Sequence, residues 1–179
     1  MKPDENIVKN FFEEKGLRVE RFDDAEMTRK TPDFKVYFND HLAFYCEVKS
    51  IFDDGVEGAR EDPTYNKIQN KVHEAVKQFN SINMHKEYLN VLALVNHEFG
   101  TDEVDLLSIL TGYFYSESGE KYPLFRKYSE GRIKDGKKLI DLYLWFERVD
   151  KEYVRFLYTD TENDTVKKLK EVLEGKATK

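Results

Sequence analysis

The 179-residue chain has little cysteine, proline and histidine, and it has no long apolar run. Its one cysteine, Cys46, cannot form an intramolecular disulfide, which fits a reducing compartment such as the cytoplasm. No apolar segment approaches the roughly 18–20 residues that span a bilayer. The N-terminal MKPDENIVKN also lacks the apolar core of a secretory leader. We therefore expect a cytoplasmic protein with no membrane partner.

Short motifs of several enzyme classes are missing as well. The patterns G-x-x-x-x-G-K-[ST], G-x-G-x-x-G and G-x-S-x-G do not occur, so NTPases, dinucleotide-binding folds and serine hydrolases lack their local signatures. One cysteine and scattered histidines do not make a zinc site. Cys46 is expected in the core, because no helix start or histidine nearby would activate its thiol.

The chain is acidic, with 29 Lys+Arg against 35 Asp+Glu and a net charge of −6. At face value this charge repels phosphate and argues against a nucleic-acid partner. The charge is unevenly distributed, because residues 121–138 contain seven basic and only two acidic side chains. A local basic surface for nucleic acid is therefore compatible with the acidic total.

Hydrophobic periodicity predicts one α/β domain over residues 1–179, with a core at 1–97 and an extension at 98–179. Helices are expected to begin at Asp4, Pro63, Thr101 and Thr161. Strands are expected at 17–22, 33–38, 42–49, 88–95, 139–149 and 153–159. This order predicts a mixed sheet flanked by helices, followed by a C-terminal β-hairpin and helix. The last two strands either extend the sheet or form an apolar dimer face, and residues 114–138 stay unassigned.

Residues 42–49 place charges in an otherwise apolar strand. Alternation with period two puts Tyr45, Glu47 and Lys49 on one face. The opposite face is apolar and consists of Phe44, Cys46 and Val48. Charges in a buried strand are costly unless they are paired or bind a metal. An exposed Glu–Lys pair on a solvated strand is the alternative interpretation.

Asp33 is expected to approach Glu47 across a hairpin closed by the turn Asn39-Asp40-His41. Two converging carboxylates suit Mg²⁺ or Mn²⁺, which bind oxygen ligands and keep positions for water and phosphate. The Val48 carbonyl is a further candidate ligand. Lys49 would orient or activate the water, or neutralise developing charge.

These residues resemble the signature of the PD-(D/E)xK nuclease superfamily. The signature here reads Pro32-Asp33 and, fourteen positions after Asp33, Glu47-Val48-Lys49. The expected element order over residues 1–97 is the one that this resemblance implies, and residues 5–19 look like the opening of archaeal Holliday-junction resolvases. The resemblance implies a restriction-endonuclease-like fold and a metal-dependent nuclease activity.

The resemblance also implies secondary site residues. Glu5 matches a helix-borne glutamate that joins the metal cluster in some relatives, and its alternative role is a first-turn acid that favours the helix dipole. Gln69 matches a glutamine on the helix after the E-x-K strand, although His73 stands where fuller signatures have tyrosine. A solvated helix face is the alternative for Gln69.

Several basic residues are candidates for contacting nucleic acid. They lie on the helix that begins at Pro63 and in the basic segment 121–138, where aromatic residues alternate with them: Lys67, Lys71, Arg126, Lys127, Arg132 and Lys134. Basic side chains suit phosphates and aromatic rings suit unpaired bases. A solvated loop is the alternative for the segment.

Taken together, these features predict a Mg²⁺- or Mn²⁺-dependent endonuclease of DNA in which Asp33, Glu47 and Lys49 carry the chemistry. A homodimer is possible, since symmetric nuclease dimers cut both strands of a duplex. The alternatives are a non-catalytic module of the same fold that binds nucleic acid or protein, and an interaction protein in which Glu47 and Lys49 form a surface pair.

Overall fold

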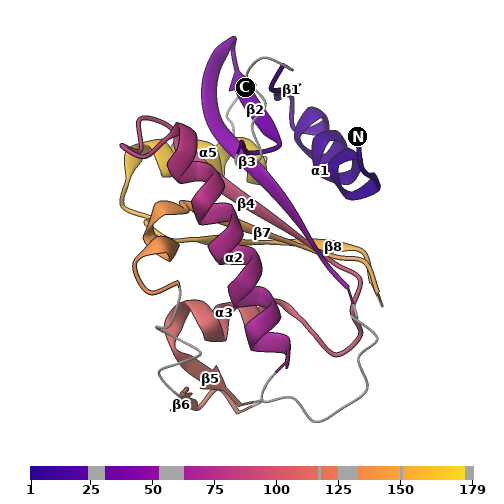
Figure 1. Cartoon of the computed structure of the whole chain (residues 1–179), viewed down its shortest axis with the longest axis vertical. Coiled ribbons are helices and arrows are strands. Elements are labelled where there is room, and N and C mark those ends of the chain that lie inside the picture. Colours follow the sequence, from indigo (N-terminus) through magenta and orange to yellow (C-terminus); the bar gives the residue numbers. More distant parts are fainter. Residues whose placement is uncertain (24–30, 53–62, 117, 125–132, 150, 176–179) are drawn as a thin grey trace.

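The computed structural model describes residues 1–23, 31–52, 63–116, 118–124, 133–149 and 151–175. The main elements follow each other in the order α1 (Pro3–Glu14), β1 (Arg18–Arg21), β2 (Phe34–Phe38), β3 (His41–Ile51), α2 (Pro63–Ile82), β4 (Leu89–Asn96), α3 (Glu103–Thr111), β5 (Tyr113–Tyr115), β6 (Lys121–Pro123), the 3-10 helix η1 (Gly136–Leu139), β7 (Leu142–Glu147), β8 (Tyr153–Tyr158) and α5 (Asp164–Glu174). Figure 1 shows this arrangement. Within these residues, no helix is both long and apolar enough to cross a membrane.

Six strands form one mixed sheet in the order β1-β2-β3-β4-β7-β8. Strands β1 to β3 are antiparallel, β4 and β7 run parallel to β3, and β8 returns antiparallel to β7. The turn between β2 and β3 has positive φ at Asn39 (49°) and Asp40 (62°), as a tight two-residue hairpin requires. The prediction of a mixed sheet flanked by helices is confirmed.

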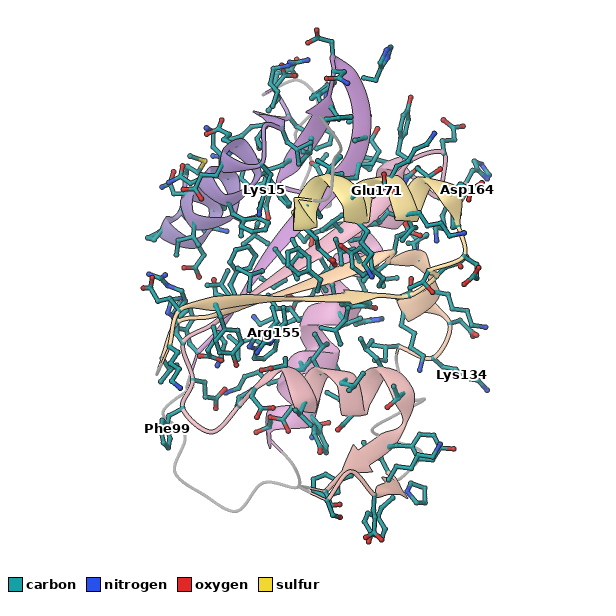
Figure 2. The ribbon with its side chains drawn as sticks, turned by 180° about the vertical axis from the view of Figure 1, so that it is seen from behind. Lys15, Phe99, Lys134, Arg155, Asp164 and Glu171 are labelled. Carbon is teal, nitrogen blue, oxygen red and sulfur yellow. The ribbon has the colours of Figure 1, made fainter. Side chains whose placement is uncertain are left out.

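Two cores lie on opposite faces of the sheet. Helices α1 and α5 cover one face, and α2, α3 and η1 cover the other. Figure 2 shows the sheet nearly edge-on between these two layers. The alternation predicted for β3 is confirmed, because Phe44, Cys46 and Val48 join the core of α1 while Tyr45 and Ile51 join the core of α2.

The C-terminal hairpin extends the sheet. Strand β7 pairs with β4 from Val91–Leu142 to Asn96–Glu147, so it continues the parallel part of the core. Tyr143 and Trp145 are fully buried beneath α2 and α3. The aromatic residues of β7 therefore serve the interior of this chain and do not form the dimer face considered from the sequence.

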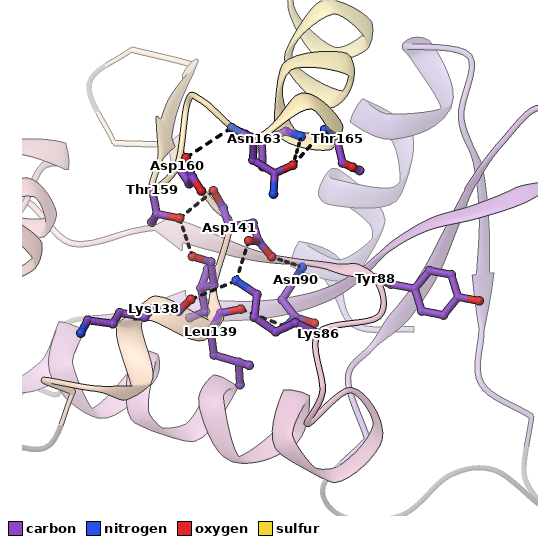
Figure 3. Close-up of polar contacts among 12 residues, drawn as sticks. Lys86, Tyr88, Asn90, Lys138, Leu139, Asp141, Thr159, Asp160, Asn163 and Thr165 are labelled. Atoms are coloured by element: carbon purple, nitrogen blue, oxygen red, sulfur yellow. Dashed lines mark hydrogen bonds and ion pairs between the residues drawn. The ribbon is translucent and has the colours of Figure 1, made fainter.

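A polar network joins the start of β4 to the start of β7 (Figure 3). The Asp141 carboxylate accepts hydrogen bonds from the Lys86 ammonium at 2.7 Å and from the Asn90 backbone N–H at 2.9 Å. Lys86 also donates to the Lys138 carbonyl at 3.0 Å. Because Asn90 and Asp141 are buried, these bonds satisfy groups that would otherwise destabilise the fold.

Three of the predicted helix starts are wrong. Asp102 and Asn163 cap α3 and α5 with their side chains, whereas Thr101 and Thr161 precede the caps. Asp4 lies inside the first turn of α1, after the N-cap Lys2. Any Asp, Asn or Thr near a helix start can supply a capping oxygen, so composition alone does not choose among neighbours.

Candidate active site

Asp33 lies immediately before β2, directly opposite Glu47 on β3. The antiparallel ladder between the two strands begins with Phe34 paired to Cys46. Asp33, one residue before Phe34, therefore lies opposite Glu47, one residue after Cys46. The Asp33 Oδ2 atom accepts a hydrogen bond of 2.8 Å from the Val48 backbone N–H. The hairpin register predicted from the sequence is therefore the one observed.

Glu47 is buried and paired with Lys49. Its side chain is 2% exposed, and its Oε1 atom lies 2.8 Å from the Lys49 ammonium. The second oxygen, Oε2, is buried and has no hydrogen-bond partner among the described residues. The exposed Glu–Lys pair considered from the sequence is therefore wrong, because a solvated strand would not hide this carboxylate.

The surroundings raise the pKa of both carboxyl groups of this site. Burial, the largest cause, and the Asp33 charge raise the pKa of Glu47 to about 8, against the opposing effect of Lys49 and a smaller one of Gln78. Burial also raises the pKa of Asp33, with a further contribution from Glu5, while the Val48 N–H lowers it. Two carboxyl groups held close together in an apolar setting are costly to ionise together unless a cation joins them.

The oxygen atoms of this site suit a hard divalent cation that takes few of its ligands from the protein. Among the described residues, no group of three or more His, Cys, Asp or Glu side chains is placed to hold a metal, so Asp33 and Glu47 would act as a pair. Since the Val48 N–H points towards Asp33, its carbonyl points to the same side of β3. These three oxygen donors leave positions for water and phosphate, as Mg²⁺ prefers, and the unpartnered Glu47 Oε2 offers a ligand atom.

Glu5 lies near this pair but already has partners. Its Oε2 atom accepts from the Lys2 backbone N–H at 3.0 Å and lies 3.6 Å from the Arg21 guanidinium. The first of these contacts is half of a capping box at the start of α1. These contacts are those of a first-turn acid, and the role of Glu5 as a metal ligand stays a prediction.

Helix α2 contacts the site through Gln78, which faces Glu47, and Glu74, which faces Lys49. The Gln78 amide donates to the Thr31 carbonyl at 3.1 Å and also faces Glu47. Glu74 Oε2 lies 3.6 Å from the Lys49 ammonium. Gln69 is buried in the same helix, nine residues before Gln78 and therefore about 13 Å away along the axis.

Sequence reasoning missed Gln78 and Glu74, and the signal that could have found them is topological. A crossover helix between the parallel strands β3 and β4 must run back along β3. The later turns of α2 therefore lie beside the middle of β3, and the first turns lie beside its end.

The structure separates the candidates for nucleic-acid contact. The Lys67 ammonium binds the Glu98 carboxylate at 2.6–2.7 Å and the Phe52 carbonyl at 2.8 Å, so its charge is largely used within the protein. Lys71 is half-buried on α2, and Lys134 is exposed before η1. The remaining candidates lie outside the described residues: Arg126, Lys127 and Arg132.

A second polar cluster lies at the C-terminal ends of β3 and β4, around the buried carboxylate of Asp4. The Asp4 carboxylate is 3.0 and 3.1 Å from His97 Nε2 and also accepts a hydrogen bond from the Ser50 hydroxyl. The Phe52 ring stacks on His97 with centroids 4.6 Å apart. Sequence spacing gave no signal for this cluster, because Asp4 and His97 are 93 residues apart.

Comparison with known proteins adds no relative. No family model, no curated protein and no solved structure matches the chain. The site is therefore interpreted from its own geometry.

Proposed function

We propose that this protein is a divalent-metal-dependent nuclease that hydrolyses phosphodiester bonds in DNA. One observation carries the proposal. The buried carboxyl group of Glu47 and the half-buried one of Asp33 lie opposite each other at the start of β2, and the Lys49 ammonium is 2.8 Å from Glu47. Buried ionisable groups with raised pKa values, gathered around one unpartnered oxygen, are typical of functional sites.

The arrangement of the first part of the chain supports the same proposal. The order α1, β1, β2, β3, α2, β4, with an antiparallel β1-β2-β3 unit and β4 parallel to β3, has the element order that the resemblance to the PD-(D/E)xK superfamily implies. We accordingly propose a restriction-endonuclease-like fold, to which β7, β8 and α5 add a C-terminal extension.

In this proposal the ligands are Asp33, Glu47 and the Val48 carbonyl. Bound Mg²⁺ or Mn²⁺ would lower the pKa of a water molecule and offset negative charge on the phosphate. Lys49 would orient that water through its ammonium group. That water oxygen would bond to phosphorus as the bond from phosphorus to the leaving oxygen breaks, the proton lost by the water would pass to solvent, and the leaving oxygen would take up a proton from solvent.

Cleavage assays on end-labelled DNA test the proposal. Single-stranded, duplex and branched DNA are incubated with the protein in Mg²⁺, Mn²⁺ or EDTA. The test variants are Asp33→Asn, Glu47→Gln and Lys49→Met, and the control is Glu14→Gln, an exposed residue of α1. We expect metal-dependent cleavage that falls by a factor of about 10² or more in each test variant and stays unchanged in the control.

Calorimetric titration with Mn²⁺ separates the alternatives. The nuclease requires Mn²⁺ binding by the wild type and its loss in Asp33→Asn. Absence of both Mn²⁺ binding and cleavage of any DNA form would favour the non-catalytic module or the interaction protein. Cleavage by Glu47→Gln at the wild-type rate in Mg²⁺ would refute the site assignment.

A further inference from the structure

Strands β5 and β6 form a small antiparallel ribbon that is separate from the six-stranded sheet. The ribbon follows the C-terminus of α3 and lies at the end of the molecule opposite the β2–β3 turn (Figure 1). The chain returns to α3 through a hydrogen bond of 2.9 Å from the Leu124 N–H to the Gly112 carbonyl. This ribbon and most of η1 supply the regular structure described in the segment that the sequence left unassigned.

The ribbon exposes large aromatic rings. Phe114 and Tyr122 are directly opposite each other across the two strands, and they are 46% and 51% exposed. Tyr113 is exposed on the other face, where the Lys121 ammonium lies 5.0 Å from the centre of its ring. None of these three rings belongs to either core. A clustered set of exposed aromatics of this kind marks a binding surface.

Charge indicates which partner fits the ribbon. Strand β6 opens the segment 121–138, whose seven basic and two acidic side chains contrast with an acidic chain. The end of that segment returns to the ribbon's base, since the Lys137 ammonium donates to the Leu110 carbonyl of α3 at 2.7 Å. Lys134 and Lys138 are exposed there. Aromatic faces beside ammonium groups match bases beside phosphates.

The same segment also contacts the helix that faces the candidate active site. Gly136 of η1 packs so closely on α2 that a Cβ atom there would lie 3.0 Å from Val76 Cγ1. Val76 is two residues from Glu74 and Gln78, which contact Lys49 and Glu47 from another side of the same helix. Helix α2 therefore packs against both η1, at the end of the basic segment, and the candidate active site.

We propose that Phe114 and Tyr122 on one face of the ribbon form a stacking platform for unpaired nucleobases, and that Tyr113 and Lys121 on the other face add a second ring and a positive charge. The rings can reach bases only where those bases are not paired, so the platform selects single-stranded DNA or single-stranded parts of branched DNA. This inference rests on the proposed nuclease function and narrows its substrate class.

Fluorescence anisotropy in EDTA tests the platform independently of metal binding and cleavage. Labelled single-stranded DNA and a blunt duplex of equal length are titrated with the wild type, with Phe114→Ala/Tyr122→Ala and with the control Phe99→Ala. Phe99 is a suitable control because it is 78% exposed and lies outside the ribbon. Stacking contributes about 1–3 kcal/mol per base, so we expect a roughly tenfold or greater loss of single-strand affinity in the double variant.

The control and the duplex should each change by less than a factor of about two, which is within the spread of surface substitutions. Equal single-strand affinity of the wild type and the double variant would overturn the proposal. So would loss of self-association in sedimentation without loss of DNA binding, because the ribbon would then be a protein interface. If the double variant misfolds, the same titration with Tyr122→Trp decides, since stacked bases quench the new indole and an unchanged emission refutes stacking.

Failure of this proposal can be told apart from failure of the nuclease. A protein that binds single strands through the ribbon and cuts no DNA keeps the platform and refutes the nuclease. A protein that cuts DNA with unchanged efficiency in the double variant keeps the nuclease and refutes the platform.

Discussion

Replacing Glu47 by Gln should stabilise the metal-free protein at neutral pH. Glutamine keeps the size of the side chain and its ability to bond to neighbours, but it cannot ionise. In the wild type, burial and the Asp33 charge raise the pKa of Glu47 from an ordinary 4.5 to about 8. The folded state therefore holds this proton more tightly than the unfolded chain does, and ionisation of Glu47 works against folding.

The sign and size of the effect follow from linkage. Below pH 4.5 the group is protonated in both states and costs nothing. Between pH 4.5 and pH 8 the unfolded chain ionises while the folded protein stays protonated, so the free energy of unfolding falls as pH rises. At about 1.36 kcal/mol for each unit of pKa difference, the loss reaches about 3 kcal/mol at pH 7 and about 5 kcal/mol well above pH 8. Glu47→Gln does not suffer this loss.

Urea unfolding measured by circular dichroism at several pH values between 4.5 and 8.5, in EDTA, gives the required comparison. The difference in unfolding free energy between Glu47→Gln and the wild type should grow by about 3 kcal/mol between pH 4.5 and pH 7, because other titrating groups largely cancel. The exposed control Glu14→Gln should follow the wild type throughout. A difference that does not change with pH would refute the claim that Glu47 is held protonated by its surroundings.

Two further predictions concern metal binding by Glu47 and the hydrogen bonds of Asp141. The affinity for Mn²⁺ should rise as the pH approaches about 8, because Glu47 must lose its proton to bind the ion. Calorimetry in buffers of different ionisation enthalpy measures both the affinity and the released proton. An affinity that does not depend on pH would contradict this prediction. Asp141→Ala should lower the free energy of unfolding by about 3 kcal/mol, since it leaves the Asn90 N–H and the Lys86 ammonium without their carboxylate. The exposed control Glu162→Ala should change this free energy little. Equal urea midpoints for the two variants would contradict the stabilising role of the network.

The strands of the candidate site could be predicted because their determinants are local. Alternation in β3 assigns Glu47 and Lys49 to one face, and the length of the β2–β3 hairpin brings Asp33 opposite Glu47. Both facts depend on residues fewer than twenty positions apart. The mixed sheet could be predicted in the same way, from the order of elements and the short connections between them.

The rest of the site depends on packing between distant elements. Gln78 meets Thr31 across 47 residues and Asp4 meets His97 across 93, and neither pair has a sequence spacing that repeats or alternates. The place of Gln78 beside Glu47 depends on how far α2 runs back along β3, which its apolar stripe does not determine. Three helix starts were predicted wrongly for another reason, because several residues near each start can supply the capping oxygen.

The reactivity of the Cys46 thiol can report how often β3 becomes exposed to solvent. The chain has one thiol, and it is fully buried in β3 beside Glu47, with its pKa raised by burial. A thiol reagent can reach it only when β3 becomes exposed, so the labelling rate of the unmodified protein reports the free energy of that event. Opening of β3, the strand that carries Glu47 and Lys49, can thus be followed without engineering a cysteine into the chain.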